Sequence, residues 1–175
     1  MEIGKIMISE EELSSRVKEL AKQISEDYRG KELIVIGILK GCFVFMSDLI
    51  RNLDCDVKVY FMEISSYSMG TESLGKITIK KDLDVDIEGK DVLIAEDIID
   101  SGNTLSQLTK ILAERKPNSV KVCTLLSKPS RRQVEFEGDY TGFVIEDKFI
   151  IGYGLDCAES FRQLPYIAEV EIIDE

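Results

Sequence analysis

The 175-residue sequence contains no histidine, the side chain most often used as a general base or metal ligand near neutral pH. This absence excludes every mechanism that depends on a histidine base or a histidine-bound metal. Long apolar runs are also missing, and none approaches the roughly 20 residues of a membrane-spanning helix. The N-terminal segment 1–12 lacks the apolar core of a signal peptide. We therefore expect a cytoplasmic protein that does not interact with membranes.

Cysteines are few, and they are not paired in the sequence. Cys42, Cys55, Cys123 and Cys157 form no C-x-x-C pair and show no spacing typical of metal ligands. Cys42 and Cys123 lie in apolar stretches, where an unpaired cysteine behaves as a small buried apolar residue. We therefore predict that these two are reduced core residues, in agreement with a reducing compartment.

Positive charge is scarce in this chain. The 22 lysines and arginines face 33 aspartates and glutamates, so the formal net charge is −11. Nucleic acids are bound by clustered Lys and Arg, and they are therefore not expected as partners. A small anionic substrate is compatible with this balance if a metal ion, backbone amides and a few lysines offset the local repulsion.

Apolar runs that alternate with amphipathic stretches define the expected fold. Strands are predicted at 32–39, 56–64, 92–95 and 119–126, with shorter ones at 76–81, 143–145, 149–152 and 167–173. Helices are predicted from the capping box of Ser9 and Glu12 to Gly30, from Gly41 through Asn52, and from Thr104 onward. This alternation is typical of the α/β class, with a central, mainly parallel twisted sheet flanked by helices. We expect one domain over residues 1–175, because 44% hydrophobic content is ordinary for a globular chain of this length.

One stretch in the middle of the chain passes abruptly from apolar to acidic residues. The run Val92–Ala95 is followed by the carboxylates of Glu96, Asp97 and Asp100, and then by the small polar loop 101–104 ahead of a helix. The amides of such a loop and the helix N-terminus suit a phosphate. The carboxylates suit sugar hydroxyls or a divalent metal ion. Together they describe a ribose phosphate, although the spacing alone also fits a plain turn and helix cap.

Residues 92–104 resemble the phosphoribosyl-pyrophosphate (PRPP) signature of the type I phosphoribosyltransferases. The order is four apolar residues, two acids, two apolar residues, Asp, a small residue, Gly, any residue and Thr. The two adjacent acids before Ile98-Ile99-Asp100 are most similar to the hypoxanthine-guanine phosphoribosyltransferases. The resemblance implies transfer of the phosphoribosyl group from PRPP to hypoxanthine or guanine, with magnesium, giving IMP or GMP and pyrophosphate. It also implies a homodimer or homotetramer and a small hood of short strands from the chain ends.

The resemblance also assigns roles to individual residues in the PRPP half of the site. Asp100 is the general base and acid that exchanges a proton with purine N7. Glu96 and Asp97 face the ribose hydroxyls and, with Asp156, the magnesium ion. The 5′-phosphate is assigned to Ser101, Gly102, Asn103 and Thr104.

Two further loops are assigned to the pyrophosphate and to closure of the site. Leu39-Lys40-Gly41 resembles the family's pyrophosphate loop, in which a non-proline cis peptide precedes the lysine, and Arg162 matches a second pyrophosphate contact. By residue type alone, Lys40 fits a solvated loop lysine. Ser66 and Tyr67 match the family's mobile loop within the polar segment 65–75, where Ser68 stands in place of the usual Gly.

The C-terminal third is assigned to the purine. Lys128 matches the lysine that contacts the 6-oxo oxygen, Phe149 the ring that stacks on the base, and Ile150 the residue whose backbone meets its edge. A cation prefers an oxo acceptor to an amino donor, so adenine is disfavoured. Read alone, Phe149 fits a core residue. Because parallel sheets bind ligands beyond the carboxyl ends of their strands, the loops after Leu39, Ile64, Ala95 and Leu126 are expected to form one site.

Two alternative functions remain open from the sequence, and a third is excluded. The first is a phosphoribosyltransferase for xanthine or a pyrimidine, which the PRPP loop does not distinguish. The second is a regulator that senses PRPP or a nucleotide on the same fold. The acidic charge opposes nucleic-acid binding by such a regulator, and Asp100 favours catalysis. A P-loop kinase is excluded because no G-x-x-x-x-G-K-[ST] motif is present.

Overall fold

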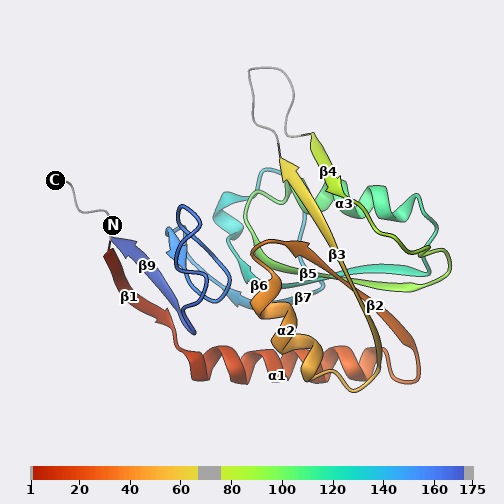
Figure 1. Cartoon of the computed structure of the whole chain (residues 1–175), viewed down its shortest axis with the longest axis horizontal. Coiled ribbons are helices and arrows are strands. Elements are labelled where there is room, and N and C mark those ends of the chain that lie inside the picture. Colours follow the sequence, from red (N-terminus) through yellow and green to blue (C-terminus); the bar gives the residue numbers. More distant parts are fainter. Residues whose placement is uncertain (1, 67–75, 172–175) are drawn as a thin grey trace.

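A six-stranded sheet forms the centre of the molecule in the computed structural model, which describes residues 2–66 and 76–171 (Figure 1). The strand order is β4-β3-β2-β5-β6-β7, and every neighbouring pair is parallel except β3 with β4. The strands are β2 (Glu32–Leu39), β3 (Asp56–Ser66), β4 (Ile77–Lys81), β5 (Asp91–Ile99), β6 (Ser119–Ser127) and β7 (Tyr140–Val144). The predicted α/β class with a mainly parallel sheet is confirmed.

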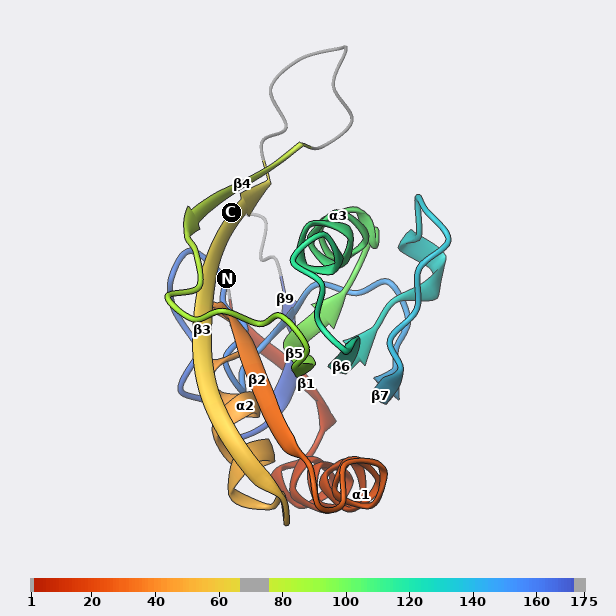
Figure 2. The same cartoon turned by 90° about the vertical axis from the view of Figure 1, so that its right-hand side faces the viewer.

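Helices cover both faces of this sheet. Helices α1 (Glu10–Asp27) and α2 (Phe43–Arg51) pack on one face, and α3 (Asn103–Ala113) packs on the other (Figure 2). Successive β2 side chains serve the two cores in turn, because strand side chains alternate between faces. Leu33 and Val35 join the α1–α2 core, whereas Ile34 and Ile36 join the α3 core. No helix among the described residues is long and apolar enough to cross a membrane.

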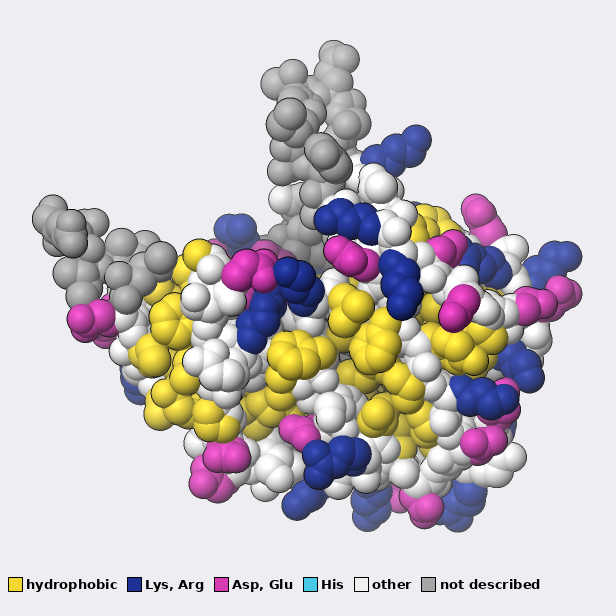
Figure 3. Space-filling view, viewed as in Figure 1, with side chains coloured by type: hydrophobic (Ala, Val, Ile, Leu, Met, Phe, Trp, Pro, Cys, Tyr) yellow, Lys and Arg dark blue, Asp and Glu magenta, His cyan; other side chains and the backbone are white. Residues whose placement is uncertain are grey.

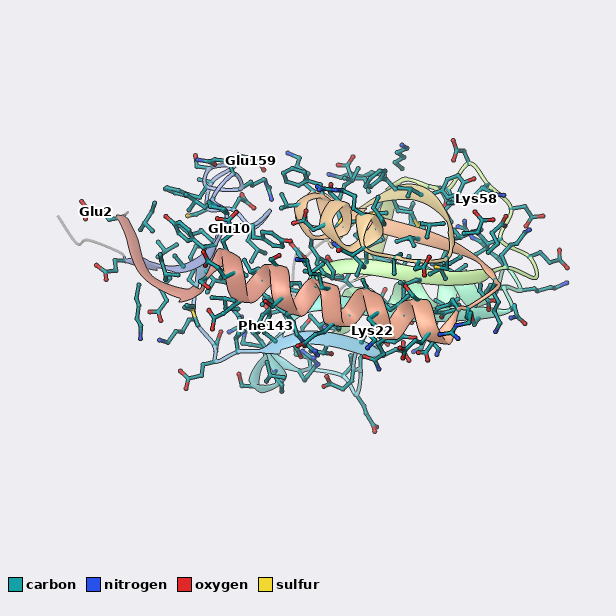
Figure 4. The ribbon with its side chains drawn as sticks, turned by 90° about the horizontal axis from the view of Figure 1, so that it is seen from below. Glu2, Glu10, Lys22, Lys58, Phe143 and Glu159 are labelled. Carbon is teal, nitrogen blue, oxygen red and sulfur yellow. The ribbon has the colours of Figure 1, made fainter. Side chains whose placement is uncertain are left out.

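Helix α1 illustrates how the local sequence fixes an element. Ser9 accepts a hydrogen bond from the Glu12 amide through its side chain, and the Glu12 carboxylate accepts one from the Ser9 amide. The predicted apolar stripe is buried, and the chain leaves the helix through Gly30 at φ +73°. Figure 4 shows the helix lying along this face, with Glu10 at its start and Lys22 toward its end.

A second, antiparallel sheet is built from the two ends of the chain. Its order is β1-β9-β8, formed by β1 (Glu2–Ile8), β9 (Ile167–Glu171) and β8 (Ile150–Ile151). The predicted hood of short strands is confirmed, and it lies at one end of the central sheet (Figure 1). The strand β1 was not predicted because most of its side chains are exposed, so no apolar pattern marks it. The predicted strand 167–173 ends at Glu171, and its last two positions lie outside the described residues.

Several predicted boundaries were wrong where polar residues remain hydrogen-bonded within the sheet. Strand β5 was predicted to end at Ala95, but it continues to Ile99 and stays paired with β6. Glu96 and Asp97 therefore lie in a strand and not in an acidic turn. Strand β3 likewise runs past the predicted 56–64 to Ser66, whereas β7 begins earlier than predicted, at Tyr140, and ends at Val144. Backbone hydrogen bonds between strands do not depend on side-chain polarity. At the carboxyl end of β5 the apolar pattern therefore stops before the hydrogen-bonded strand does.

Candidate active site

The carboxyl ends of the parallel strands enclose a cavity of about 220 Å³. It is lined by residues 96–102, Thr104 and Leu105, with Ile38 from β2 and Ile64 from β3. The acidic end of β5 and the following loop therefore form one concave surface, as expected for a parallel sheet. Cys42 and Cys123 are buried, and no disulfide joins any of the four cysteines, all of which lie in the described part of the chain.

The loop between β5 and α3 has the geometry of an anion site. Gly102 is the residue before the first turn of α3, and its φ of +81° is one that glycine adopts without strain. Glycine has no side-chain oxygen, so Gly102 makes no side-chain capping hydrogen bond to the amides at the start of α3. The Ser101 hydroxyl accepts a hydrogen bond from the Asn103 amide (3.2 Å) and shapes the turn. The loop and the start of α3 border the cavity through Ser101, Gly102 and Thr104, where a helix N-terminus favours an anion.

Asp97 lies against the loop that follows β2. A Cβ atom placed on Gly41 would come within 1.6 Å of Asp97 Oδ2, so any side chain at position 41 would displace this carboxylate. The Leu39–Lys40 peptide bond just before it is cis, as predicted. The candidate pyrophosphate loop and a candidate ribose carboxylate are therefore in direct contact.

Glu96 is the buried member of the acidic pair, with 8% of its surface exposed. Its Oε1 accepts a hydrogen bond from the Asp97 amide (3.0 Å). Burial raises the pKa of the Glu96 carboxyl well above its ordinary value, and the adjacent Asp97 charge adds to the rise. The folded chain thus holds a carboxyl whose ionised form lacks the solvation it has in water.

This burial predicts a pH-dependent effect of Glu96→Gln on stability. A carboxyl whose pKa is raised on folding binds its proton more tightly in the folded state, so ionisation destabilises that state. This loss of folding stability is absent below about pH 4.3, the ordinary pKa of a Glu carboxyl, and it grows as the pH rises toward the pKa of Glu96 in the folded state. In metal-free buffer, the variant should therefore melt at a higher temperature than the wild type near pH 8 and at a similar temperature near pH 4. A wild type that gains stability over the variant as pH rises would contradict this burial.

The purine side of the site lies at the end of β6. Lys128 is almost buried, and its Nζ donates a hydrogen bond to the Lys148 carbonyl (2.6 Å) and lies 3.7 Å from Asp147 Oδ1. Phe149 is 58% exposed, so the interpretation as a core residue was wrong, and its ring is free to stack on a base. Ile150 is buried in β8. The loop 146–149 thus links Lys128, through the Lys148 carbonyl, to the backbone next to Phe149.

The pyrophosphate side gathers residues from two distant segments. Lys40 pairs with Glu159 (2.8 Å), and Arg162 pairs with Asp156 (2.9 Å) and approaches Glu159 at 3.6 Å. The Lys40 hydrogen bond lowers the pKa of Glu159. A Cβ on Gly154 would lie 2.2 Å from the Gly41 carbonyl oxygen, so the two segments touch through glycines. Lys40, Asp156 and Arg162 are thus linked through their ion pairs and Glu159, whereas Asp156 forms no metal-ligating group of three with Glu96 and Asp97 among the described residues.

Three residues of this region were not predicted from the sequence as part of the site. Glu159 lies between Lys40 and Arg162, whereas Arg131 and Arg132 surround Asp100. The only available signal was the position of the two arginines just after Lys128. Of the predicted closing loop, Ser66 is the last residue of β3, and Tyr67 lies outside the described residues.

Comparison with known proteins agrees with this geometry. Residues 8–158 match the family model described as the phosphoribosyl transferase domain. The chain is 49% identical to a hypoxanthine phosphoribosyltransferase of Salmonella typhimurium over 97% of both chains, and 47% identical to a hypoxanthine-guanine phosphoribosyltransferase of Staphylococcus aureus over 97% of this chain and 95% of the other. A crystal structure of a hypoxanthine-guanine phosphoribosyltransferase from Bacillus anthracis superposes with a TM-score of 0.94 at 52% identity, covering 97% of this chain and all of the other. The chain therefore belongs to the phosphoribosyltransferase family, and within it to the hypoxanthine and hypoxanthine-guanine phosphoribosyltransferases.

Proposed function

We propose that this protein transfers the 5-phosphoribosyl group of PRPP to hypoxanthine or guanine in purine salvage. In this reaction the bond between ribose C1′ and pyrophosphate breaks, a bond from C1′ to purine N9 forms, and the N7 proton passes to Asp100. The products are IMP or GMP and pyrophosphate. The observation that carries the proposal is the meeting of an anion loop, an Asp and a nearly buried Lys at one edge of the sheet.

Each part of the substrate is matched by a different segment. The loop 101–104 binds the 5′-phosphate through amides and hydroxyls, and Glu96 and Asp97 face the ribose hydroxyls. We assign Lys40, Gly41 and Arg162 to the pyrophosphate; their segments touch through Gly41 and Gly154, and both cations lie near Glu159. Lys128 donates to the 6-oxo oxygen, while Phe149 stacks on the base and the Ile150 backbone meets its edge. Ser66 and Tyr67 belong to the segment that we propose closes over the reactants.

We propose magnesium as the cofactor, held by one or two of the carboxylates of Glu96, Asp97 and Asp156 together with water and the substrate phosphates. Within residues 2–66 and 76–171, no group of three or more His, Cys, Asp or Glu side chains is arranged to hold a metal ion by itself. This suits magnesium, which usually takes one or two carboxylates and completes its shell with water and substrate phosphates. When bound, it would neutralise charge on the departing pyrophosphate. The positive charge of the metal would also offset the free-energy cost of ionising the buried Glu96 carboxyl beside Asp97.

The proposed assembly is a homodimer or homotetramer. Apolar side chains gather on the face that carries α2, where Phe43 is 44% exposed (Figure 3). A second cavity of about 740 Å³ is lined by residues of α1, α2 and the segment 153–165, among them Glu10 and Glu159, which are labelled in Figure 4. An apolar surface of this kind suits another copy of the chain. We place the protein in the cytoplasm, and the absence of a disulfide among its four cysteines, all in described segments, agrees with that compartment.

The proposed activity is tested by incubating the protein with PRPP, magnesium and one free base at a time. Hypoxanthine and guanine should give IMP and GMP, adenine should give little AMP, and excess chelator should abolish turnover. Xanthine and a pyrimidine base belong in the same series, since the PRPP loop does not distinguish among bases. Efficient AMP formation, or none of the three products, would overturn the assignment.

A further inference from the structure

Arg131 joins the two halves of the candidate site through its side chain. Its Nε lies 3.3 Å from Asp100 Oδ1, and its Nη1 lies 3.5 Å from Asp147 Oδ2. Asp147 in turn lies 3.7 Å from Lys128 Nζ through its other oxygen. The four side chains form a row of alternating charge from the proposed base, Asp100, to the proposed oxo-group donor, Lys128. We call this row the charge bridge.

The backbone that carries Arg131 is held in place by its neighbour. Arg131 ends the short 3₁₀-helix η1 (Pro129–Arg131), directly followed by Arg132, whose side chain is 11% exposed. Arg132 Nη1 donates to the carbonyls of Ile99 (2.9 Å) and Asp100 (2.7 Å), and its Nη2 donates to Ser127 Oγ (2.7 Å). One buried guanidinium thus ties the end of β6 to the loop that begins at Asp100. Arg131 therefore starts from a fixed position relative to the backbone of Asp100.

Stability is not a sufficient explanation for the charge bridge. The Arg131, Asp100 and Asp147 side chains are 54%, 49% and 47% exposed. Exposed ion pairs typically contribute little to the free energy of unfolding. What the charge bridge does provide is geometry, because the planar guanidinium offers several donors in fixed directions and reaches two carboxylates at once. One carboxylate is the proposed base, and the other belongs to the loop that presents Phe149.

We propose that Arg131 is a positioning residue for the transfer reaction. It fixes Asp100 through Oδ1, so that Oδ2 faces the purine and accepts the N7 proton. Through Asp147 it also holds the loop 146–149, so that stacked base and proton acceptor are aligned before PRPP reacts. This role rests on the proposed function. It predicts effects on turnover and on use of the purine, but not on PRPP affinity or on folding.

The test compares Arg131→Gln, Arg131→Lys and Asp147→Asn with the wild type, with Arg115→Gln as the matched control. Arg115 forms a bidentate pair with Asp82 away from the candidate site, so its loss should leave kinetics unchanged. Arg131→Gln should lower kcat by about 10- to 100-fold, because small misalignments of reacting groups carry losses of this order. The Michaelis constant for hypoxanthine should rise, whereas that for PRPP and the melting temperature should not change. The Arg131→Lys variant should retain only part of the wild-type kcat, because a lysine ammonium reaches one of the two carboxylates at a time.

The double variant Arg131→Gln/Asp147→Asn separates positioning from direct contact with the substrate. If Arg131 acts through the charge bridge, the double variant should be hardly worse than the more damaged single variant. The proposal would be overturned if the fold-losses in kcat of the two single variants multiplied in the double variant. It would also be overturned if Arg131→Lys had full wild-type activity, or if Arg131→Gln had unchanged kinetics. A large fall in melting temperature that accounts for the lost activity would overturn it as well. A wild type that forms no IMP would instead overturn the proposed function.

Discussion

Asp100→Asn should lower the turnover number by about 10²–10⁴-fold, the usual contribution of general acid–base assistance. Asparagine keeps the size of the side chain and its hydrogen-bonding reach, but it does not accept the N7 proton. PRPP affinity should change little, because the substitution leaves unchanged the loop 101–104, to which we assign the 5′-phosphate. The contact with Arg131 is retained through the amide oxygen, so the surrounding geometry should persist.

Turnover and melting temperature should both be measured on the same preparation of the Asp100→Asn variant, and on the wild type in parallel. If Asp100 were only a turn and capping residue, asparagine would serve nearly as well as aspartate. Near-normal turnover would then remove Asp100 from the chemistry. A large loss of turnover at an unchanged melting temperature is the result expected for a proton acceptor.

Lys128→Met should lower kcat/KM for hypoxanthine and guanine by about 10- to 100-fold. A hydrogen bond to a charged group contributes roughly 1.5–3 kcal/mol, and each 1.4 kcal/mol is a factor of ten. Methionine keeps the length and apolar stem of this almost buried side chain but offers no donor to the 6-oxo oxygen. Discrimination against adenine should shrink for the same reason. The Michaelis constant for PRPP should stay close to that of the wild type.

Lys121→Met provides the matched control for this variant. Lys121 lies on the strand that leads to Lys128, and its ammonium lies over the rings of Tyr28 and Tyr140 at 5.7 Å. Its loss should lower stability slightly and leave the choice of base unchanged. If Lys128→Met altered only the use of PRPP, the assignment of Lys128 to the purine would be wrong.

The strands and helices of the core could be predicted because their buried positions are occupied by apolar residues at regular spacing. The run Val92–Ala95 is apolar at every position, since both faces of β5 are covered by helices. The strand β1 shows the limit of this signal. Its bounds are set by pairing with β9, while most of its side chains remain exposed and follow no apolar alternation. Where hydrogen bonding and not burial defines a strand, composition does not reveal it.

The candidate site was predictable where it forms one continuous stretch, as in residues 96–104. Lys128 and Phe149 were identified through the resemblance, since neither residue type by itself indicates a purine. The contacts of Arg131 with Asp100 and of Lys40 with Glu159 join residues 31 and 119 positions apart. Such pairs depend on how strands are ordered in the sheet and on where loops turn. A single sequence carries no local pattern for them.

The most direct measurement is a crystal structure of the protein with IMP bound. We expect the 5′-phosphate at the loop 101–104, purine N7 within hydrogen-bonding distance of the Asp100 carboxylate, and the 6-oxo oxygen within hydrogen-bonding distance of Lys128 Nζ. The base should stack on Phe149. A nucleotide in the larger cavity beside α1 and α2, or a purine whose N7 lies away from Asp100, would contradict the central claim.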